Sequence, residues 1–226
     1  MCIRDSITNV AIQKTTFKYE IPYMLLITAV LLVMGMTGNE ITFIEGVILW
    51  ILFIAYLLYL YFLAKKGNDS GDEQSVKLYP VWKCLLFIVL GGVCVVIGSQ
   101  LVVNGATTIA RACGMSERFI GLTIVAFGTS LPELVTSVSA ARKGNAGIAI
   151  GNIVGSNIFN ILFVIGTVAL ICPVPFESRF VIDTVVAILC GVLLWGGTIR
   201  HKELRKPCGV VMLLCYAAYF VYLAAM

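Results

Sequence analysis

Seven long apolar stretches divide this chain, and each is long enough to cross a lipid bilayer as a helix. A transmembrane helix needs about 20 mostly apolar residues, and lipid offers backbone polar groups no other partner than the helix itself. The stretches lie near residues 21–37, 43–63, 82–103, 119–141, 147–171, 181–199 and 208–225. The sequence therefore predicts an all-α integral membrane protein with about seven transmembrane helices.

The composition excludes an ordinary water-soluble domain. Hydrophobic residues make up 60% of the chain, charged residues 12%, and the mean hydropathy is +0.99. A soluble domain is about 25% charged. The net charge of +4 lies between the apolar stretches rather than in a basic stripe with aromatic residues. We therefore expect the lipid bilayer as a partner and no nucleic acid.

The first 20 residues are interpreted as a polar N-terminal segment rather than a signal peptide. No apolar run with a small-residue cleavage site follows the first charges. The charged residues that interrupt the segment are Arg4, Asp5, Lys14, Lys18 and Glu20.

The remaining sequence is predicted to form two groups of helices joined by a cytoplasmic linker. Two transmembrane helices occupy 21–63, the linker occupies 64–81, and a five-helix repeat occupies 82–226. The linker contains a long polar stretch from Lys65 to Lys77, KKGNDSGDEQSVK, whose composition is typical of a flexible hinge.

Turn and interface residues mark the ends of several stretches. The sequence TGNE at 37–40 predicts a tight turn, and Pro173 and Pro175 are expected to end the fifth stretch. The aromatic run between Tyr56 and Phe62 fits an interfacial belt rather than a ligand cage.

The distribution of positive charge predicts a cytoplasmic N-terminus and an external C-terminus, because basic loops stay in the cytoplasm. With this orientation three of the 16 basic residues lie outside, namely Arg111, Arg118 and Arg179. The other thirteen lie on the cytoplasmic side and are Arg4, Lys14, Lys18, Lys65, Lys66, Lys77, Lys83, Arg142, Lys143, Arg200, Lys202, Arg205 and Lys206.

One acidic residue lies deep within a predicted span. Glu133 is about two-thirds of the way along the fourth stretch, in the sequence GTSLPE at 128–133. A central acid costs about 2.5–3.5 kcal/mol on insertion scales, and such residues usually face a bundle interior or a water-filled path. A protonated Glu133 bonded to a neighbouring helix is the structural alternative. Because its surroundings are polar, we favour a binding role.

The surroundings of Glu133 predict a broken helix lined with oxygen atoms. Pro132 removes a backbone donor from Gly128, so carbonyls near Ala126 and Phe127 are expected to be released. Thr129 and Ser130 precede Glu133 by four and three residues and share its helical face. A carboxylate, hydroxyls and carbonyls suit hard cations such as Ca²⁺, whereas Zn²⁺ prefers Cys or His.

The next stretch supplies a polar stripe. Asn152, Ser156 and Asn160 recur at four-residue spacing in GNIVGSNIFN at 151–160. The structural alternative is hydrogen bonding between helices. Beside the predicted break, the stripe is interpreted as a partner face for the same cation.

The two motifs together carry a resemblance to a known family. They read FIGLTIVAFGTSLPELVTSVSAARKG and then AIGNIVGSNIFNILFVIG, between Phe119 and Gly166. This stretch resembles the second α-repeat of the sodium/calcium exchanger branch of the cation/Ca²⁺ antiporter superfamily. The layout of about 21–226 is similar to spans 4–10 of bacterial members. The resemblance implies a ten-helix fold of two inverted five-helix repeats and exchange of Na⁺ for Ca²⁺ by alternating access.

The resemblance also implies a ligand set. The residues are Glu133 as the Ca²⁺-binding carboxylate, the hydroxyls of Thr129 and Ser130, the carbonyl of Ala126, and Ser156 and Asn160. The ions Na⁺ and Ca²⁺ are transported, no cofactor is implied, and the expected location is the cell inner (plasma) membrane. Members that also require K⁺ tend to carry Asp where this chain has Asn160, so K⁺-independent exchange is favoured.

One part of the family's pattern has no counterpart in the 226 residues. A full site needs a first α-repeat with its own G-T-S-x-P-E motif, and the sequence contains one such motif. We expect an incomplete chain of an antiporter; the alternative is a half-transporter that needs a partner chain supplying the first α-repeat. An intramembrane enzyme is disfavoured, because the sequence lacks H-E-x-x-H and a second membrane-embedded acid to pair with Glu133.

Overall fold

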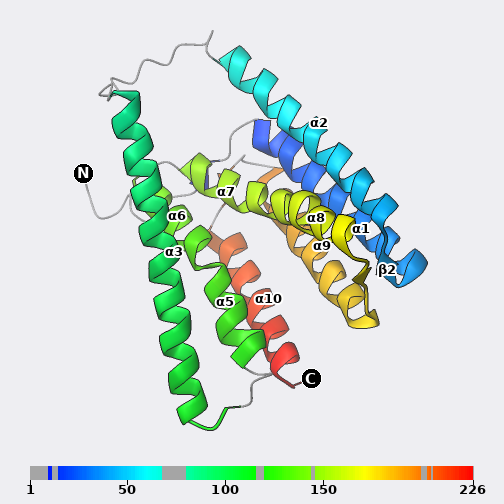
Figure 1. Cartoon of the computed structure of the whole chain (residues 1–226). Helices are drawn as coiled ribbons and strands as arrows, with labels where there is room; N and C mark the ends of the chain where they lie inside the picture. Colours follow the sequence, from blue (N-terminus) through cyan, green and yellow to red (C-terminus); the bar gives the residue numbers. More distant parts are fainter. Residues whose placement is uncertain are drawn as a thin grey trace. The chain divides into compact units, whose positions relative to one another are not determined.

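The computed structural model is built almost wholly of helices (Figure 1). It describes residues 10–11, 15–67, 80–115, 120–143, 146–199, 203–204 and 206–225. Contacts group the chain into two compact units, which are described separately. Unit 1 contains Met1–Gly71 and Ala140–Cys215, and unit 2 contains Asp72–Ser139 and Tyr216–Met226.

Unit 1 holds most of the helices and four short strands. Its elements are β1 (Val10–Ala11), the π-helical segment η2 (Thr16–Glu20), α1 (Ile21–Gly38), β2 (Glu40–Ile41), α2 (Phe43–Gly67), α7 (Ala146–Phe159), the π-helical segment η4 (Asn160–Ile165), α8 (Gly166–Ile171), β3 (Val174–Pro175), α9 (Ser178–Ile199) and β4 (Glu203–Leu204). Unit 2 holds α3 (Val81–Ala112), the π-helical segment η3 (Gly121–Val125), α5 (Ala126–Thr129) and most of α6 (Leu131–Arg142). Helix α10 (Lys206–Ala225) begins in unit 1 and ends in unit 2.

The predicted turn at 37–40 is confirmed, and it joins α1 to α2. Asn39 ends α1 in the left-handed conformation, with a φ of 54°. Thr42 then precedes α2, and the Glu45 carboxylate accepts hydrogen bonds from the Thr42 backbone N–H at 2.7 Å and from its hydroxyl at 2.9 Å. The bond from the Thr42 N–H is one half of a Thr-x-x-Glu capping box, in which a carboxylate in the first helical turn satisfies the N–H of the residue before the helix.

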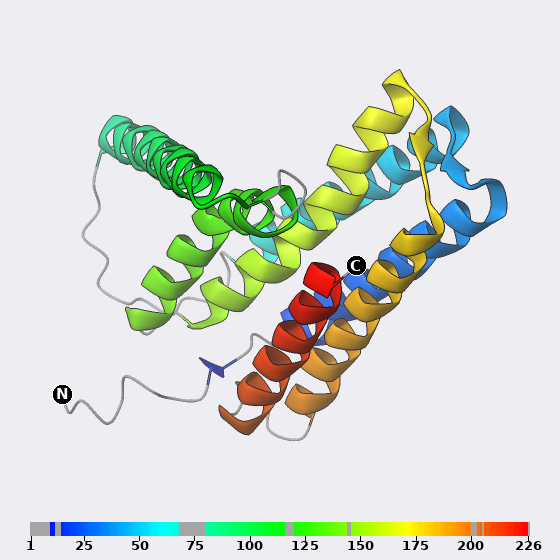
Figure 2. The same cartoon turned by 90° about the horizontal axis from the view of Figure 1, so that it is seen from below.

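A short strand pair ties this turn to the connection between α8 and α9. Antiparallel pairing joins β2 to β3 (Figure 2). Ile41 lies opposite Val174, and the Phe176 N–H donates to the Asn39 carbonyl at 2.7 Å. The Phe176 ring packs directly on Gly35 of α1, where any side chain would overlap it. Helix α8 ends at Ile171, before Pro173, as the prolines predict.

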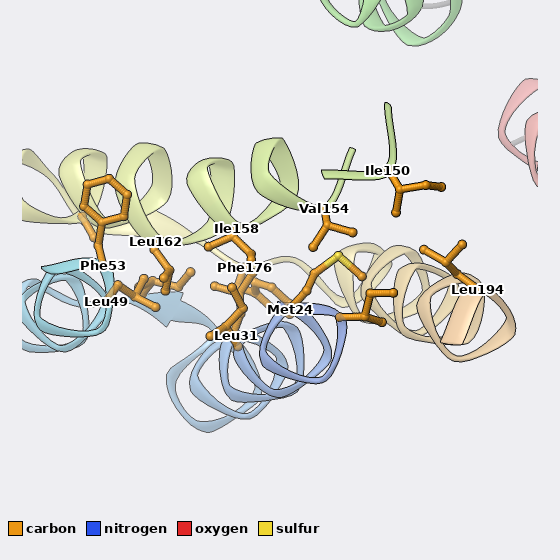
Figure 3. Packing of buried hydrophobic residues seen from close by; sticks show 14 residues of the cluster. Met24, Leu31, Leu49, Phe53, Ile150, Val154, Ile158, Leu162, Phe176 and Leu194 are labelled. Carbon is orange, nitrogen blue, oxygen red and sulfur yellow. The ribbon is translucent and has the colours of Figure 1, made fainter. Parts of the chain in front are cut away.

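The core of unit 1 lies between α1, α2, α7 to α8, and α9 (Figure 3). Helix α1 packs along α9, and α2 packs along α8. Gly46 of α2 and Gly166 of α8 permit the close contact between these two helices. A Cβ added at Gly46 would lie 2.9 Å from the Ala169 Cβ and 3.1 Å from the Gly166 carbonyl oxygen. At the same contact, the Trp50 indole N–H donates to the Thr167 hydroxyl at 3.2 Å.

The predicted class, an all-α membrane protein, is confirmed, while the number of spans is approximate. Among the described residues, five helices are long and apolar enough to cross a membrane: Thr16–Gly38, Phe43–Lys65, Val81–Ala112, Gly147–Ile171 and Phe180–Ile199. The predicted seventh span appears as a shorter apolar helix, Pro207–Tyr222. The predicted fourth span, 119–141, is interrupted, and the interruption falls at the candidate site.

The first helix begins earlier than the sequence pattern predicts. It starts at Thr16 instead of residue 21, because Thr16 is buried and the Phe17 ring packs 6.5 Å from the Trp195 ring. The rest of the predicted N-terminal segment lies largely outside the described residues, as does most of the predicted linker at 64–81. The domain boundaries based on repeats remain predictions, since contact-based units do not test them.

Candidate cation-binding site

The predicted break in the fourth apolar stretch is present at Ser130. Helix α5 ends at Thr129, Ser130 has φ −92° and ψ 0°, and α6 begins at Leu131. In a regular helix the Ser130 N–H would donate to the Ala126 carbonyl. Here it donates to the Phe127 carbonyl at 3.1 Å. The expected release of the Phe127 carbonyl is therefore wrong, and the Ala126 carbonyl loses the donor that Ser130 would supply in a regular helix.

Pro132 explains why a new helix starts here. It occupies the second position of α6, where a missing N–H is tolerated because the first N–H groups of a helix have no internal partner. It also offers no N–H to the Gly128 carbonyl, so α5 cannot continue into α6 with an unbroken ladder.

Gly128 allows the break to lie close to α3 within unit 2. A Cβ added at Gly128 would overlap the Val103 side chain of α3. The sequence singled out Gly128 for its backbone freedom, whereas the structure gives it a packing role.

Glu133 lies in the first turn of α6. It is half-buried, and its Oε2 atom is hidden from solvent. The positive end of a helix dipole favours an anionic side chain at such a position. Thr129 and Ser130, by contrast, are exposed. Sequence reasoning missed Ser137, a buried residue one turn beyond Glu133 on the same face, although the four-residue spacing could have identified it.

The predicted stripe runs along α7 to the first residue of η4 and lies opposite the buried face of this helical stretch. Val154, Ile158 and Leu162 have no exposed surface and pack into the core of unit 1 (Figure 3). Ser156 and Asn160 each lie two residues from a member of this buried row, about 200° around the helix. Asn152 and Ser156 are half-buried, and Asn160 is exposed. The stripe therefore faces away from the core of its own unit.

Local hydrogen bonds hold the side chains of Ser156, which belongs to the stripe, and of its neighbour Asn157. The Ser156 hydroxyl donates to the Ile153 carbonyl at 3.1 Å, and the Asn157 amide donates to the same carbonyl at 2.8 Å. Both bonds stay within α7, so they fix side-chain direction without joining another helix.

Two of the π-helical segments adjoin the candidate ligands. Segment η3 ends at Val125, immediately before Ala126, and η4 begins at Asn160. Such segments are uncommon and frequently occur at functional sites. No pattern in the sequence indicated them, because a π turn changes the hydrogen-bond register without requiring a particular residue type.

The candidate residues fall into two sets. Ala126, Thr129, Ser130 and Glu133 follow one another around the break in unit 2, whereas Ser156 and Asn160 share one face in unit 1. Within the described part of the chain, no three His, Cys, Asp or Glu side chains form a group that could hold a metal ion. Glu133 is the acid of a set that otherwise consists of hydroxyl, amide and carbonyl oxygens.

Comparison with known proteins decides the family. The family described as "Sodium/calcium exchanger protein" matches residues 83–225, which include all six candidate ligands. This chain belongs to the sodium/calcium exchanger family. Its members are membrane cation antiporters, and the chain is accordingly a multi-pass membrane protein.

Relatives and a solved structure agree with this assignment. CaxA of Alkalimonas amylolytica is 34% identical over 220 residues, which cover 93% of this chain and 69% of CaxA. The sodium/calcium exchanger MaX1 of Methanosarcina acetivorans is 38% identical over 142 residues, covering 62% of this chain and 41% of MaX1. The structure of the sodium-calcium exchanger NCX_Mj superposes with a TM-score of 0.76 at 31% identity, covering 96% of this chain and 69% of NCX_Mj. The chain thus spans about two thirds of the length of CaxA and of NCX_Mj.

The role of Pro132 in this exchanger-family motif can be tested with Pro132→Ala. The new N–H can donate to the Gly128 carbonyl, so we expect the helix to run through Ser130 and the amides at 130–134 to exchange more slowly in hydrogen–deuterium exchange mass spectrometry. Pro207→Ala is the matched control, because Pro207 is also the second residue of its helix, and the described element before that helix is the strand β4. Equal changes in the two variants would contradict this role for Pro132.

Proposed function

We propose that this chain is the second-repeat part of a Na⁺/Ca²⁺ antiporter and that the break at Ser130 holds part of the ion site. One observation carries the proposal: the helix is interrupted between Thr129 and Leu131, in a chain of the exchanger family. Irregular backbone at membrane depth is tolerated where it is packed in protein or lines a cavity. In transporters, substrate ions commonly bind at such interrupted helices.

The proposed ligands suit both ions. Ca²⁺ takes six to eight oxygen ligands. We assign to it the Glu133 carboxylate, the Thr129 and Ser130 hydroxyls, the Ala126 carbonyl, Ser156 and Asn160. Together with the ligands of a first α-repeat, this set of oxygens accepts either one Ca²⁺ or several Na⁺ ions in turn. Coupling then requires that each ion binds the inward-open and outward-open states with different affinity.

The rest of the proposed site comes from a first α-repeat. The chain spans about two thirds of the length of CaxA and NCX_Mj, and it carries one G-T-S-x-P-E motif. We assign the remaining ligands to a polypeptide outside these 226 residues. It is either continuous with this chain or supplied by a partner chain. Flux assays with the first repeat fused and with it co-expressed distinguish the two arrangements.

The site assignment is tested by Glu133→Gln. The change keeps the shape of the side chain and removes its charge, and a hydrogen bond or contact to a charged group contributes about 1.5–3 kcal/mol. We expect Na⁺-dependent ⁴⁵Ca²⁺ uptake into vesicles that contain this chain and a first repeat to fall at least about tenfold. Glu177→Gln is the control, since Glu177 is exposed in the connection between α8 and α9. Uptake near the wild-type rate in Glu133→Gln would refute the assignment.

The proposed independence from K⁺ is tested by Asn160→Asp. A second carboxylate raises the negative charge of the site, so we expect tighter Ca²⁺ binding or the appearance of K⁺-dependent flux. Asn157→Asp adds the same charge three residues away, at a side chain bonded within its own helix. If both variants keep the ion selectivity of the wild type, Asn160 is not a ligand.

We further propose that the N-terminus faces the cytoplasm and the C-terminus the outside of an inner (plasma) membrane. The support is the charge bias, with thirteen basic residues on one side and three on the other. Charge bias of this kind sets the orientation of most membrane proteins.

Two natural cysteines test the orientation. Cys172 is exposed in the connection between α8 and α9, and Cys84 is exposed in the first turn of α3. In intact cells a membrane-impermeant maleimide is expected to label Cys172 and to reach Cys84 after the cells are opened, with peptide mass spectrometry as the readout. The reverse pattern would invert the topology.

A further inference from the structure

The Trp50 indole begins a short hydrogen-bond chain that joins α2 to the second half of η4. Its N–H donates to the Thr167 hydroxyl at 3.2 Å, and that hydroxyl donates to the Phe163 carbonyl at 2.6 Å. Trp50 lies inside the candidate span Phe43–Lys65, where an indole N–H needs a partner from the protein. A hydroxyl can accept one bond while it donates another, so both bonds form together. All three residues belong to unit 1.

The Phe163 carbonyl lies where the π-helical register of η4 gives way to α8. This carbonyl also accepts the Gly166 N–H, a bond between residues three apart, and α8 begins at Gly166. A π-helix bonds residues five apart and an α-helix bonds residues four apart. Trp50 is therefore linked, through Thr167, to a carbonyl at which the hydrogen-bond register changes.

Aromatic rings of α2 contact the start and the second half of η4. The Phe53 centroid lies 5.9 Å from that of Phe159, which directly precedes η4, and 5.4 Å from that of Phe163. The Trp50 centroid lies 5.2 Å from that of Phe163. Phe53 and Leu162 are both buried in the core of unit 1 (Figure 3). These ring contacts place α2 along the whole π-helical segment.

The extra residue of a π-helical turn brings two buried positions onto one side. Val154 of α7 and Gly166 of α8 are both buried, and they are 12 residues apart. In a regular α-helix this separation leaves the two positions about 120° apart, whereas one residue taken up by a π turn leaves about 20°. A Cβ added at Gly166 would lie 3.2 Å from the Trp50 Cδ1 and 3.3 Å from the Leu49 Cβ. The π-helical register thus lets α7 and α8 both face the core of unit 1.

We propose that Trp50 is a positioning residue for Asn160 and that it acts by holding η4 in the π-helical register. Asn160 is the first residue of η4, and α8 is fixed on α2 at Gly46 and Gly166. Loss of the π turn would rotate Asn160 by about 100° relative to α8, which is the rotation of one helical residue. The inference rests on the proposed role of Asn160 as an ion ligand.

Hydrogen–deuterium exchange of the purified chain tests whether Trp50 holds η4. Trp50→Phe keeps a ring and removes the indole N–H, and Thr167→Val removes the hydroxyl. We expect the amides at 161–167 to exchange about two- to tenfold faster in each variant, the effect of losing one side-chain hydrogen bond between helices. The double variant should exchange no faster than the faster single variant, because both changes break the same chain of bonds.

Trp82→Phe and Thr184→Val are the matched controls for the exchange measurement. Trp82 is exposed in the first turn of α3. The Thr184 hydroxyl makes the same local bond within α9, to the Phe180 carbonyl at 2.6 Å. Neither control should change exchange at 161–167. Unchanged exchange in both Trp50→Phe and Thr167→Val would overturn the proposal.

Uptake measurements test the link to Asn160. In vesicles that contain this chain and a first repeat, Trp50→Phe is expected to raise the Ca²⁺ concentration for half-maximal Na⁺-dependent uptake about two- to tenfold and to keep the maximal rate, as loss of binding alone does. Asn160→Ala is expected to raise the same concentration. Trp50→Phe should then add no further change to Asn160→Ala, because both act on one ligand.

The outcomes separate the positioning role from the ligand assignment. Additive effects of Trp50→Phe and Asn160→Ala would overturn the positioning role and leave Asn160 as a ligand. A lower maximal rate in Trp50→Phe with an unchanged half-maximal concentration would also overturn it, since that result indicates a purely structural role. Wild-type uptake in Asn160→Ala would refute the ligand assignment and the positioning role together, and the exchange data would then assign Trp50 to the stability of η4 alone.

Discussion

Backbone hydrogen bonding inside an apolar solvent governs the architecture of this protein. Lipid offers N–H and C=O groups no partners, so each long apolar stretch must satisfy its own backbone as a helix. The same constraint makes the interruption at Ser130 costly. A break in the backbone hydrogen bonds of a helix costs free energy unless other groups bond to the released N–H and C=O groups. Pro132 and Gly128 hold that break open, one by withholding a donor and the other by allowing α3 to approach. The chain places its one deeply set acid, Glu133, directly after it.

Unit 1 is a scaffold that directs one face of α7 away from the core of this unit. Helices approach closely where glycine permits it, as at Gly46 and Gly166, and the strand pair β2–β3 ties the two connections at one end together. Burial of Val154, Ile158 and Leu162 then fixes the rotation of α7. Once those three side chains are packed, Ser156 and Asn160 have to lie on the opposite face. Apolar packing thus positions this face of the helix, and the Ser156 hydroxyl adds a hydrogen bond that stays within the helix.

A cavity of about 270 Å³ between the start of the first helix and the second half of α2 illustrates how tertiary contacts change the interpretation of an aromatic run. Along α2, tyrosines at the end of a span are typical of an interfacial belt. The structure sets Tyr56 and Tyr59 against Tyr19, Glu20 and Tyr23 of the preceding helix. Tyrosines of α2 alone could anchor the protein at the membrane interface. Together with Tyr19, Glu20 and Tyr23 of the preceding helix they enclose a cavity. Tyr19, Glu20 and Tyr23 lie more than 30 residues before Tyr56 in the sequence, so the aromatic run in α2 does not by itself indicate that they meet it.

The sequence by itself determined the membrane class, most helix positions, the turn at Asn39, the break near Pro132 and the family. Each of these depends on local chemistry: apolar length, proline and glycine geometry, or a long contiguous motif. The tertiary structure decided what local patterns do not encode. It decided which carbonyl loses its donor at the break, where π-helical turns begin, how early the first helix starts, and that Gly128 is needed for packing. The physical reason is that these features depend on which side chains from distant segments meet, and residue spacing along one helix does not specify its neighbours.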